Sequence, residues 1–208
     1  MNEIIQNIIT ALYAQSWLEV TAVVTAILYL ILVIKENIWC WPFAFVSTAI
    51  YVYLFHSVAL LSESLLNIYY LVMAVYGWWQ WRKKLQSPAL KIQQWRLMTH
   101  LKIISGCLLL TPVIGFFMTK LGASFPYIDA FVLVMAVIAT LMVAKKVFEN
   151  WYYWLIIDTI SIYLFWQKQM YLTALLFVVY IALIFAGIRA WKILFKHGNS
   201  ITTNKANS

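Results

Sequence analysis

One apolar run, residues 151–167, carries the residue types that could bind a small molecule. Trp151, Trp154 and Asp158 are spaced by three and four positions, so a helix would place them on one face. Asp158 falls near the middle of the run, where a carboxylate is costly unless it faces a cavity or a partner. The neighbouring Asn150 amide can both donate and accept hydrogen bonds. This face is the predicted binding site, and the alternative for Asp158 is a structural carboxyl hydrogen-bonded to another helix.

The composition indicates what kind of protein must hold this face in place. Of the 208 residues, 64% are hydrophobic and 11% are charged, and the mean hydropathy is +0.83. A soluble domain of this length could not cover so much apolar surface. The apolar runs are continuous, and each is close to the ~20 residues that cross a bilayer as a helix. We therefore expect an all-α integral membrane protein with seven spans, at 17–34, 39–55, 60–81, 102–119, 126–144, 151–167 and 171–192.

The distribution of basic residues predicts how the chain is oriented. With seven spans, thirteen of the 15 Lys and Arg residues fall on one side, while Lys120 and Lys168 fall on the other. Because basic loops stay in the cytoplasm, the N-terminus should lie outside and the C-terminus inside a bacterial inner membrane. The net charge is +8, and we expect the basic loop at 82–101 to contact lipid headgroups rather than nucleic acid.

The two ends of the chain differ from the spans. Residues 1–16 would place their apolar side chains on one face of a short helix, which predicts an N-terminal helix lying in the membrane interface. Residues 193–208 form a predicted cytoplasmic tail. From His197 onward this tail is polar, and we expect it to be disordered.

The first and last thirds of the chain resemble each other. At an offset of 110, residues 17–19 match 127–129, and Tyr70, Gly77 and Trp81 match Tyr180, Gly187 and Trp191. At an offset of 113, Glu36, Asn37 and Trp41 match Glu149, Asn150 and Trp154. We therefore predict a first three-helix repeat at 17–81 and a second at 126–192. The segment between them, 82–125, would hold the basic loop, a connecting helix and an outer loop. A single connecting span makes the two copies parallel, as in transporters whose halves rock around a shared site.

The repeat brings further side chains to the predicted site. Asn67 and Tyr70 of the third span and Tyr180 of the seventh would contribute to substrate binding. The residues predicted to form an entrance or a gate lie nearer the ends of the spans, with Glu19, Glu63 and Asp129 toward the outer side and Asn37 and Trp41 toward the cytoplasm. The three acids are alternatively headgroup-level charges. A tryptophan near the end of a span, such as Trp41 or Trp151, is alternatively an interface anchor.

The charges within the spans narrow the class of substrate. The spans contain four acids and lack a central Lys or Arg, so they would receive an anion poorly. Acids and tryptophan faces would instead favour a cationic aromatic ligand. We find no enzyme motif, and the three histidines lack the spacing of metal ligands. The sequence therefore predicts a non-enzymatic protein without a cofactor or metal site.

Several motifs are similar to those of the PnuC vitamin transporters. These motifs are Glu149-Asn150-Trp151 with Trp154 and Asp158, Tyr76-Gly77-Trp78 with Trp81, Asp129 with Lys145-Lys146, and Gly187 with Trp191. The resemblance covers nearly the whole chain. It implies a three-plus-one-plus-three fold, similar in outline to that of the SWEET sugar transporters, and a homotrimer. It also implies uptake of nicotinamide riboside by facilitated diffusion, with a cytoplasmic nucleoside kinase trapping the product.

Alternatives remain open on the sequence alone. Asn67 stands where the family would have a glutamine, and relatives carry thiamine or riboflavin, so the identity of the vitamin stays open. A SWEET-like sugar carrier would need fewer acids than this chain has. A proton-coupled carrier, and a receptor or enzyme in the membrane, are the other competing classes.

Overall fold

The described part of the chain is built from seven helices. The computed structural model describes residues 17–57, 61–83, 91–167 and 171–206. The helices are α2 (Trp17–Ile34), α3 (Cys40–Ser57), α4 (Leu61–Lys83), α5 (Leu97–Lys120), α6 (Pro126–Ala144), α7 (Asn150–Gln167) and α8 (Tyr171–Ala206). The predicted interfacial helix within residues 1–16 lies outside the described residues.

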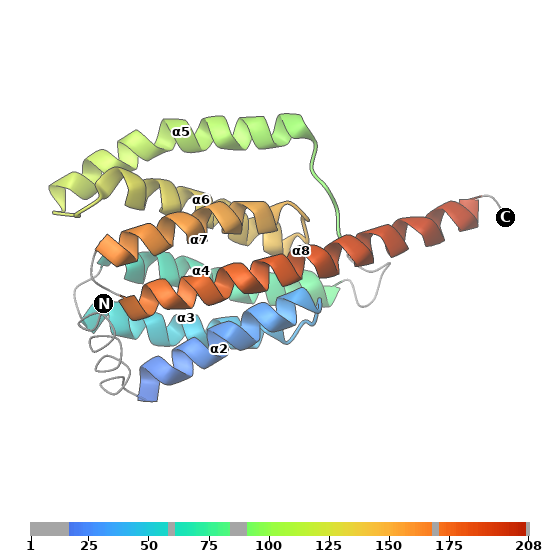
Figure 1. Ribbon diagram of the computed structural model, residues 1–208, viewed down its shortest axis with the longest axis horizontal. Coiled ribbons are helices and arrows are strands. Elements are labelled where there is room, and N and C mark those ends of the chain that lie inside the picture. The colour runs from blue at the N-terminus through green and yellow to red at the C-terminus, as the bar shows by residue number, and fades with distance from the viewer. Residues whose placement is uncertain (1–16, 58–60, 84–90, 168–170, 207–208) are drawn as a thin grey trace.

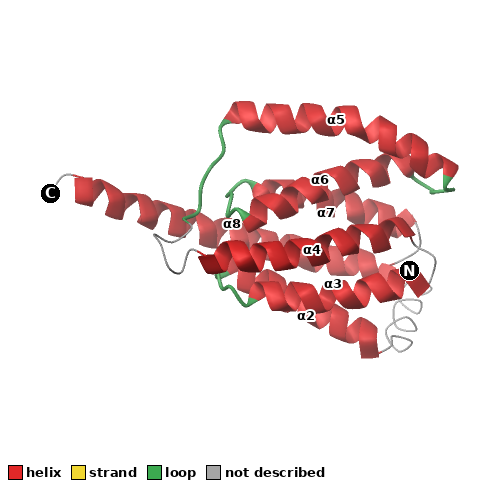
Figure 2. Cartoon of the chain, turned by 180° about the vertical axis from the view of Figure 1, so that it is seen from behind, coloured by secondary structure: helices red, strands yellow, loops and turns green. Residues whose placement is uncertain are grey.

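Six of these helices form a closed ring. In order around the ring, α2 packs on α3, α3 on α4, α4 on α6, α6 on α7, α7 on α8, and α8 packs back on α2. Helix α5 packs on α6 and lies at the edge of the bundle in both views (Figures 1 and 2). The ring therefore brings the first helix and the last side by side, and α5 stays outside it.

The two ends of the bundle carry different charges. Helices α2, α4, α6 and α8 run one way, and the other three run back (Figure 1). We call the end where α2 and α6 finish the basic end, because Lys35, Arg82 and Lys145 lie there. We call the opposite end, where Glu19 and Asp129 occupy the first turns of α2 and α6, the acidic end.

Several predicted boundaries are wrong. Helix α8 does not stop at residue 192 but continues to Ala206 and projects beyond the bundle at the basic end, so the tail is not disordered as predicted (Figure 1). Each residue added to an existing helix gains one backbone hydrogen bond, and this stretch has no proline to stop it. Helix α5 begins at Leu97 rather than at 102.

Part of the predicted long loop is held against the bundle. The Gln93 N–H donates to the Lys146 oxygen at 3.0 Å, and the Phe148 N–H donates to the Gln93 oxygen at 2.8 Å. The Gln93 side chain also donates from Nε2 to the Lys145 oxygen at 2.9 Å. These bonds fix the segment before α5 on the connection between α6 and α7.

Length and composition mark four of the described helices as membrane spans. These stretches are Trp17–Ile34, Leu97–Lys120, Pro126–Ala144 and Thr173–His197, while Cys40–His56 is a shorter apolar helix. Helices α4 and α7 hold Asn67, Asn150 and Asp158, whose side chains are buried inside the bundle. An intramembrane polar group is tolerated in that position. The protein is therefore an all-helical membrane protein, and these polar side chains of α4 and α7 are buried within its bundle.

Several helix boundaries in the first and last thirds of the chain are separated by the same offset. The starts of α3 and α7, the ends of α3 and α7, and the starts of α4 and α8 are each 110 positions apart. The predicted offset of 113, which aligns Trp41 with Trp154, is therefore wrong at this point. Trp41 corresponds instead to Trp151, because the two rings pack against Gly77 and Gly187, which are themselves 110 positions apart.

Candidate functional site

The predicted face of α7 points into the bundle. Asn150, Trp151 and Asp158 are 0%, 1% and 3% exposed, and Trp154, one turn deeper than Trp151, is half-buried. Trp154 contacts both clusters of buried hydrophobic residues, so it lies between the two parts of the core. The three-and-four spacing thus places the polar and aromatic side chains of α7 on its interior side.

An ionisable group, the Asp158 carboxyl, lies in this interior. It lies eight residues after the start of α7, which is ~12 Å of helix rise from the basic end. Both Tyr70 of α4 and Tyr180 of α8 lie within electrostatic range of its carboxyl. Among the described residues, the Asp158 carboxyl has no hydrogen-bond or ion-pair partner. A buried carboxyl of this kind is suited to binding a cation or hydroxyl groups of a ligand.

Two tyrosines that the sequence did not single out complete this group. Tyr29 of α2 lies within electrostatic range of both Tyr70 and Tyr180, and its ring centroid is 6.2 Å from that of Trp41. Tyr51 of α3 is within electrostatic range of Tyr180. Five helices therefore direct hydroxyl or carboxyl groups to one region. A tyrosine in the middle of an apolar span was the available signal for Tyr29 and Tyr51, but only the fold shows which tyrosines meet.

Two matching tryptophan pairs lie between this region and the basic end. The Trp41 and Trp81 rings meet edge to face with centroids 5.5 Å apart, and the Trp151 and Trp191 rings do so at 5.4 Å. All four rings are buried. The interpretation of Trp41 and Trp151 as interface anchors is therefore wrong, because neither indole reaches the membrane surface.

The packing of these tryptophans requires glycine on the neighbouring helix. A Cβ atom at Gly77 would overlap the Trp41 ring, and one at Gly187 would overlap the Trp151 ring. Each glycine thus lets an indole lie directly against the backbone of α4 or α8. This arrangement explains why the sequence repeats a glycine and a tryptophan at the end of each of these spans.

Three polar atoms near the tryptophans are buried without a partner among the described residues. They are the Nε1 atoms of Trp41 and Trp151 and the Oδ1 atom of Asn150. The Asn150 amide nitrogen donates to the Val147 oxygen at 2.6 Å, which fixes the direction of Oδ1. Leaving such atoms unpaired costs free energy, so they are natural contacts for a polar ligand.

The predicted gating residues occupy separate places. Asn37 is exposed, and its Oδ1 accepts the backbone N–H of Trp39 at 3.0 Å, so it caps the start of α3 and stays away from the buried site. Glu19 and Asp129 are half-buried at the acidic end. Glu63 lies in α4, with its side chain outside the described part, and Asn67 is buried one turn before Tyr70.

A hollow on the outside of the bundle differs in character from this site. It is about 530 Å³ in volume and is lined by residues of α6 and α7, including Tyr127, Phe131 and Tyr163. The lining is almost wholly apolar, although Tyr127, Thr159 and Tyr163 carry hydroxyl groups, so the hollow offers few polar groups to orient a ligand. The described residues contain no group of three His, Cys, Asp or Glu side chains that could hold a metal ion.

Comparison with known proteins agrees with these features. A family model described as nicotinamide mononucleotide transporter matches residues 16–193. The nicotinamide riboside transporter PnuC of Escherichia coli (strain K12) is 25% identical over 206 residues, covering 86% of each protein. The riboflavin/roseoflavin transporter RibM of Streptomyces davaonensis is 23% identical over 182 residues, covering 84% of each.

A solved structure shares the fold. The crystal structure of the vitamin B3 transporter PnuC matches with a TM-score of 0.74 at 24% identity, over 93% of this chain and 88% of that chain. The family model covers most of the sequence, from the start of α2 to just past Trp191 in α8. This chain belongs to the nicotinamide mononucleotide transporter family.

Proposed function

We propose that this chain carries nicotinamide riboside across the bacterial inner membrane by facilitated diffusion. The observation that carries the proposal is the position of Asp158, a buried carboxyl without a basic partner among the described residues, within range of tyrosines from α4 and α8. Nicotinamide riboside offers a cationic aromatic ring, a carboxamide and ribose hydroxyls. The site has a matching group for each of them.

Each part of the substrate has a proposed contact. Trp154, with Trp151 behind it, stacks on the nicotinamide ring. The unpaired Asn150 Oδ1 accepts a carboxamide N–H. Asp158 balances the positive ring or binds the ribose hydroxyls together with Tyr70 and Tyr180. Asn67, one turn from Tyr70, completes the proposed set.

The charge of the site favours the riboside over the mononucleotide. A phosphate group is usually bound by Arg or Lys. In the described residues, Lys35, Arg82 and Lys146 lie at or just after helix ends, and the Asp158 carboxyl has no basic partner. A phosphate beside an unpaired carboxyl would be repelled. Riboflavin is the alternative substrate, because a riboflavin transporter is also similar over most of the chain, and thiamine is a further vitamin alternative.

The ring of helices supports a proposal for the transport mechanism. We propose that α2–α4 and α6–α8 are two parallel copies of one three-helix unit, that α5 connects them, and that rocking between the units exposes the site to each side in turn. The excess of Lys and Arg at the basic end supports a cytoplasmic location for that end and an outer location for Glu19, Asp129 and the N-terminus. A homotrimer, and a cytoplasmic nucleoside kinase that traps the substrate, belong to the same proposal.

Calorimetric titration of the purified chain tests the choice of substrate. The panel is nicotinamide riboside, nicotinamide mononucleotide, thiamine, riboflavin and sucrose. We expect the riboside to bind. The mononucleotide and sucrose should bind at least ~100-fold more weakly, because the phosphate would be repelled by the Asp158 carboxyl and sucrose has no positive charge to pair with it. Tight binding of riboflavin or thiamine in place of the riboside would assign the chain to that vitamin.

A further inference from the structure

Two residues at the basic end adopt an unusual backbone conformation at equivalent positions. Glu36 follows α2 with φ 51°, and Lys146 follows α6 with φ 53°. In each case the helix ends in the same hydrogen-bond pattern, with the Asn37 N–H bonded to the Leu32 oxygen and the Val147 N–H bonded to the Met142 oxygen. This left-handed position normally holds glycine. A charged residue there is strained, and such strain is characteristic of functional sites.

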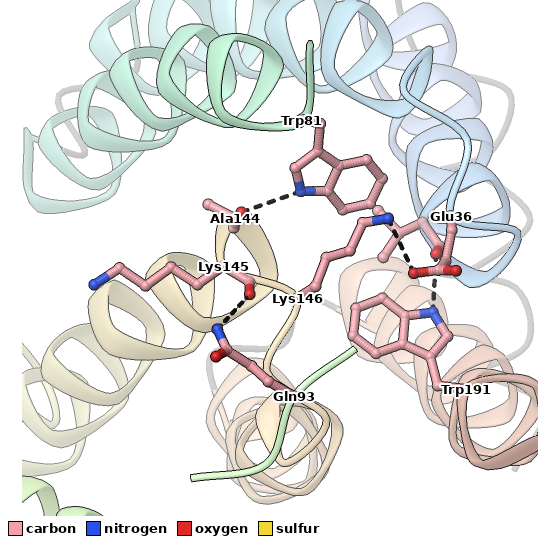
Figure 3. A network of polar contacts seen from close by, with 8 residues as sticks. Glu36, Trp81, Gln93, Ala144, Lys145, Lys146 and Trp191 are labelled. Atoms are coloured by element: carbon pink, nitrogen blue, oxygen red, sulfur yellow. Dashed lines mark hydrogen bonds and ion pairs between the residues drawn. The ribbon is translucent and has the colours of Figure 1, made fainter. Parts of the chain in front are cut away.

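These two residues bind each other. Lys146 Nζ lies 3.0 Å from Glu36 Oε1, and both side chains are mostly buried, at 12% and 23% exposed. The same ammonium lies 4.4 Å from the centre of the Trp81 ring. Figure 3 shows the Lys146 side chain reaching between Trp81 and Glu36. One lysine from the end of α6 therefore joins the end of α2 to the end of α4.

The two indoles beside this ion pair make a matched pair of crossed hydrogen bonds. Trp81 of α4 donates from Nε1 to the Ala144 oxygen at the end of α6, at 3.1 Å. Trp191 of α8 donates from Nε1 to the Val33 oxygen near the end of α2, also at 3.1 Å (Figure 3). Both bonds join a helix of α2–α4 to a helix of α6–α8. The carbonyls that accept them lie in the last turn of a helix, and the Val33 oxygen also accepts the Glu36 N–H at 3.0 Å.

We propose that Glu36, Lys146, Trp81 and Trp191 form a clasp that holds the two three-helix units together at the basic end and must open for substrate to pass there. The inference rests on the proposed function, because only a transporter needs this end to open. Every link in the clasp is polar, so water can replace it when the units separate. Trp81 and Trp191 also pack on Trp41 and Trp151, so the clasp is in direct contact with the tryptophans beside the site.

A native cysteine reports on the clasp. Cys40 is the first residue of α3, is fully buried, and lies within electrostatic range of Lys146. Opening the basic end should expose its thiol. Cys107, the other cysteine of the chain, is buried among residues of α5 and α6, away from the clasp. It becomes exposed when the bundle unfolds.

The experiment measures how fast a water-soluble maleimide labels the full chain in detergent. In a Cys107→Ser background, the parent should label slowly at Cys40. Lys146→Met and Glu36→Gln should each accelerate labelling by about five- to tenfold, because the open population rises when one polar link is lost. The double variant should be no faster than the faster single one, since both changes remove the same ion pair. Lys146→Arg, which keeps the charge, should label at the parental rate.

Two controls make the result decisive. Lys145→Met removes the neighbouring positive charge, but the Lys145 side chain points away from Glu36 in Figure 3, so labelling of Cys40 should not change. In a Cys40→Ser background, Cys107 should stay slow in every variant. Parental labelling of Cys40 in Lys146→Met, or equal acceleration of Cys107, would overturn the clasp. Calorimetry on the same samples tests the substrate separately, so failure of either proposal is distinguished from failure of the other.

Discussion

The Trp151 ring of α7 meets the Trp191 ring of α8 edge to face, with centroids 5.4 Å apart and planes at 88°. The Trp41 and Trp81 rings repeat this geometry in α3 and α4, at 5.5 Å and 89°. A pair of buried aromatic rings in this arrangement adds ~0.5–1.5 kcal/mol beyond the area it buries. The two pairs therefore stabilise corresponding corners of the bundle and position the indoles next to the proposed site.

Substitution of Gly187 by alanine should destabilise the protein. The added methyl group would overlap the Trp151 ring, and overpacking of a tight core typically costs ~1–3 kcal/mol. The midpoint of thermal unfolding in detergent should fall accordingly, and Gly77→Ala should act in the same way against Trp41. The matched control is Gly106→Ala in α5, where a Cβ meets nothing within 4 Å. That variant should be as stable as the parent or more so, because alanine favours a helix over glycine by ~1 kcal/mol. An unfolding midpoint for Gly187→Ala equal to that of Gly106→Ala would show that the contact is not tight.

Truncation of Trp154 should weaken substrate binding. In Trp154→Ala, loss of the stacking ring should make the free energy of binding less favourable by ~1–3 kcal/mol, as for aromatic residues that stack on nucleic-acid bases. Trp166→Ala, on the same helix but half-exposed near its other end, is the control and should bind as the parent does. If calorimetry gives the same affinity for Trp154→Ala and Trp166→Ala, the ring is not part of the site.

Replacement of Asp158 by asparagine should reduce affinity for a cationic substrate more than for a neutral one. The change keeps the size of the side chain and replaces the carboxyl that would bind a cationic group by a neutral amide, and a hydrogen bond to a charged group contributes ~1.5–3 kcal/mol. Asp129→Asn at the acidic end, far from Tyr70 and Tyr180, should change affinity by less than ~0.5 kcal/mol. Unaltered binding in Asp158→Asn would favour the structural interpretation of this carboxyl.

The orientation of the chain is open to a labelling test. In a background without Cys40 and Cys107, Gln94→Cys should resist an impermeant thiol reagent in intact cells and react after permeabilisation, because we propose that the basic end lies in the cytoplasm. Gln94 and Leu121 are both exposed, at opposite ends of α5. Leu121→Cys should therefore react in intact cells. The reverse pattern would invert the assignment.

The local features of the fold follow from the sequence, while the contacts between distant segments do not. The apolar runs predict most helices to within a few residues, and the spacing on α7 predicts its buried face, because helical periodicity and the cost of an intramembrane carboxylate are local properties. The sequence does not predict the path of α8 past residue 192, because polarity alone does not end a helix that already has its hydrogen bonds. It aligns Trp41 with Trp154 rather than with Trp151, because matching residue types within the aromatic-rich runs does not reveal which indole contacts which glycine.

The group of side chains at the site was likewise only partly predictable. Asp158, Tyr70 and Tyr180 lie together as the sequence repeat suggests, but nothing local distinguishes Tyr29 from the other tyrosines. The Glu36–Lys146 pair joins two helix ends that are 110 positions apart, and both residues occupy a backbone position that sequence patterns reserve for glycine. Contacts of this kind depend on how α2–α4 meet α6–α8, which no single segment specifies.

The most direct measurement of the central claim is uptake of labelled nicotinamide riboside by liposomes that contain the purified chain. Without any ion gradient, the substrate should reach equal concentrations inside and outside, and it should accumulate only when a nucleoside kinase and ATP are enclosed. Protein-free liposomes and liposomes with Asp158→Asn provide the baselines. Uphill accumulation driven by a pH or sodium gradient without the kinase, or no uptake above the protein-free baseline, would contradict facilitated diffusion of this substrate.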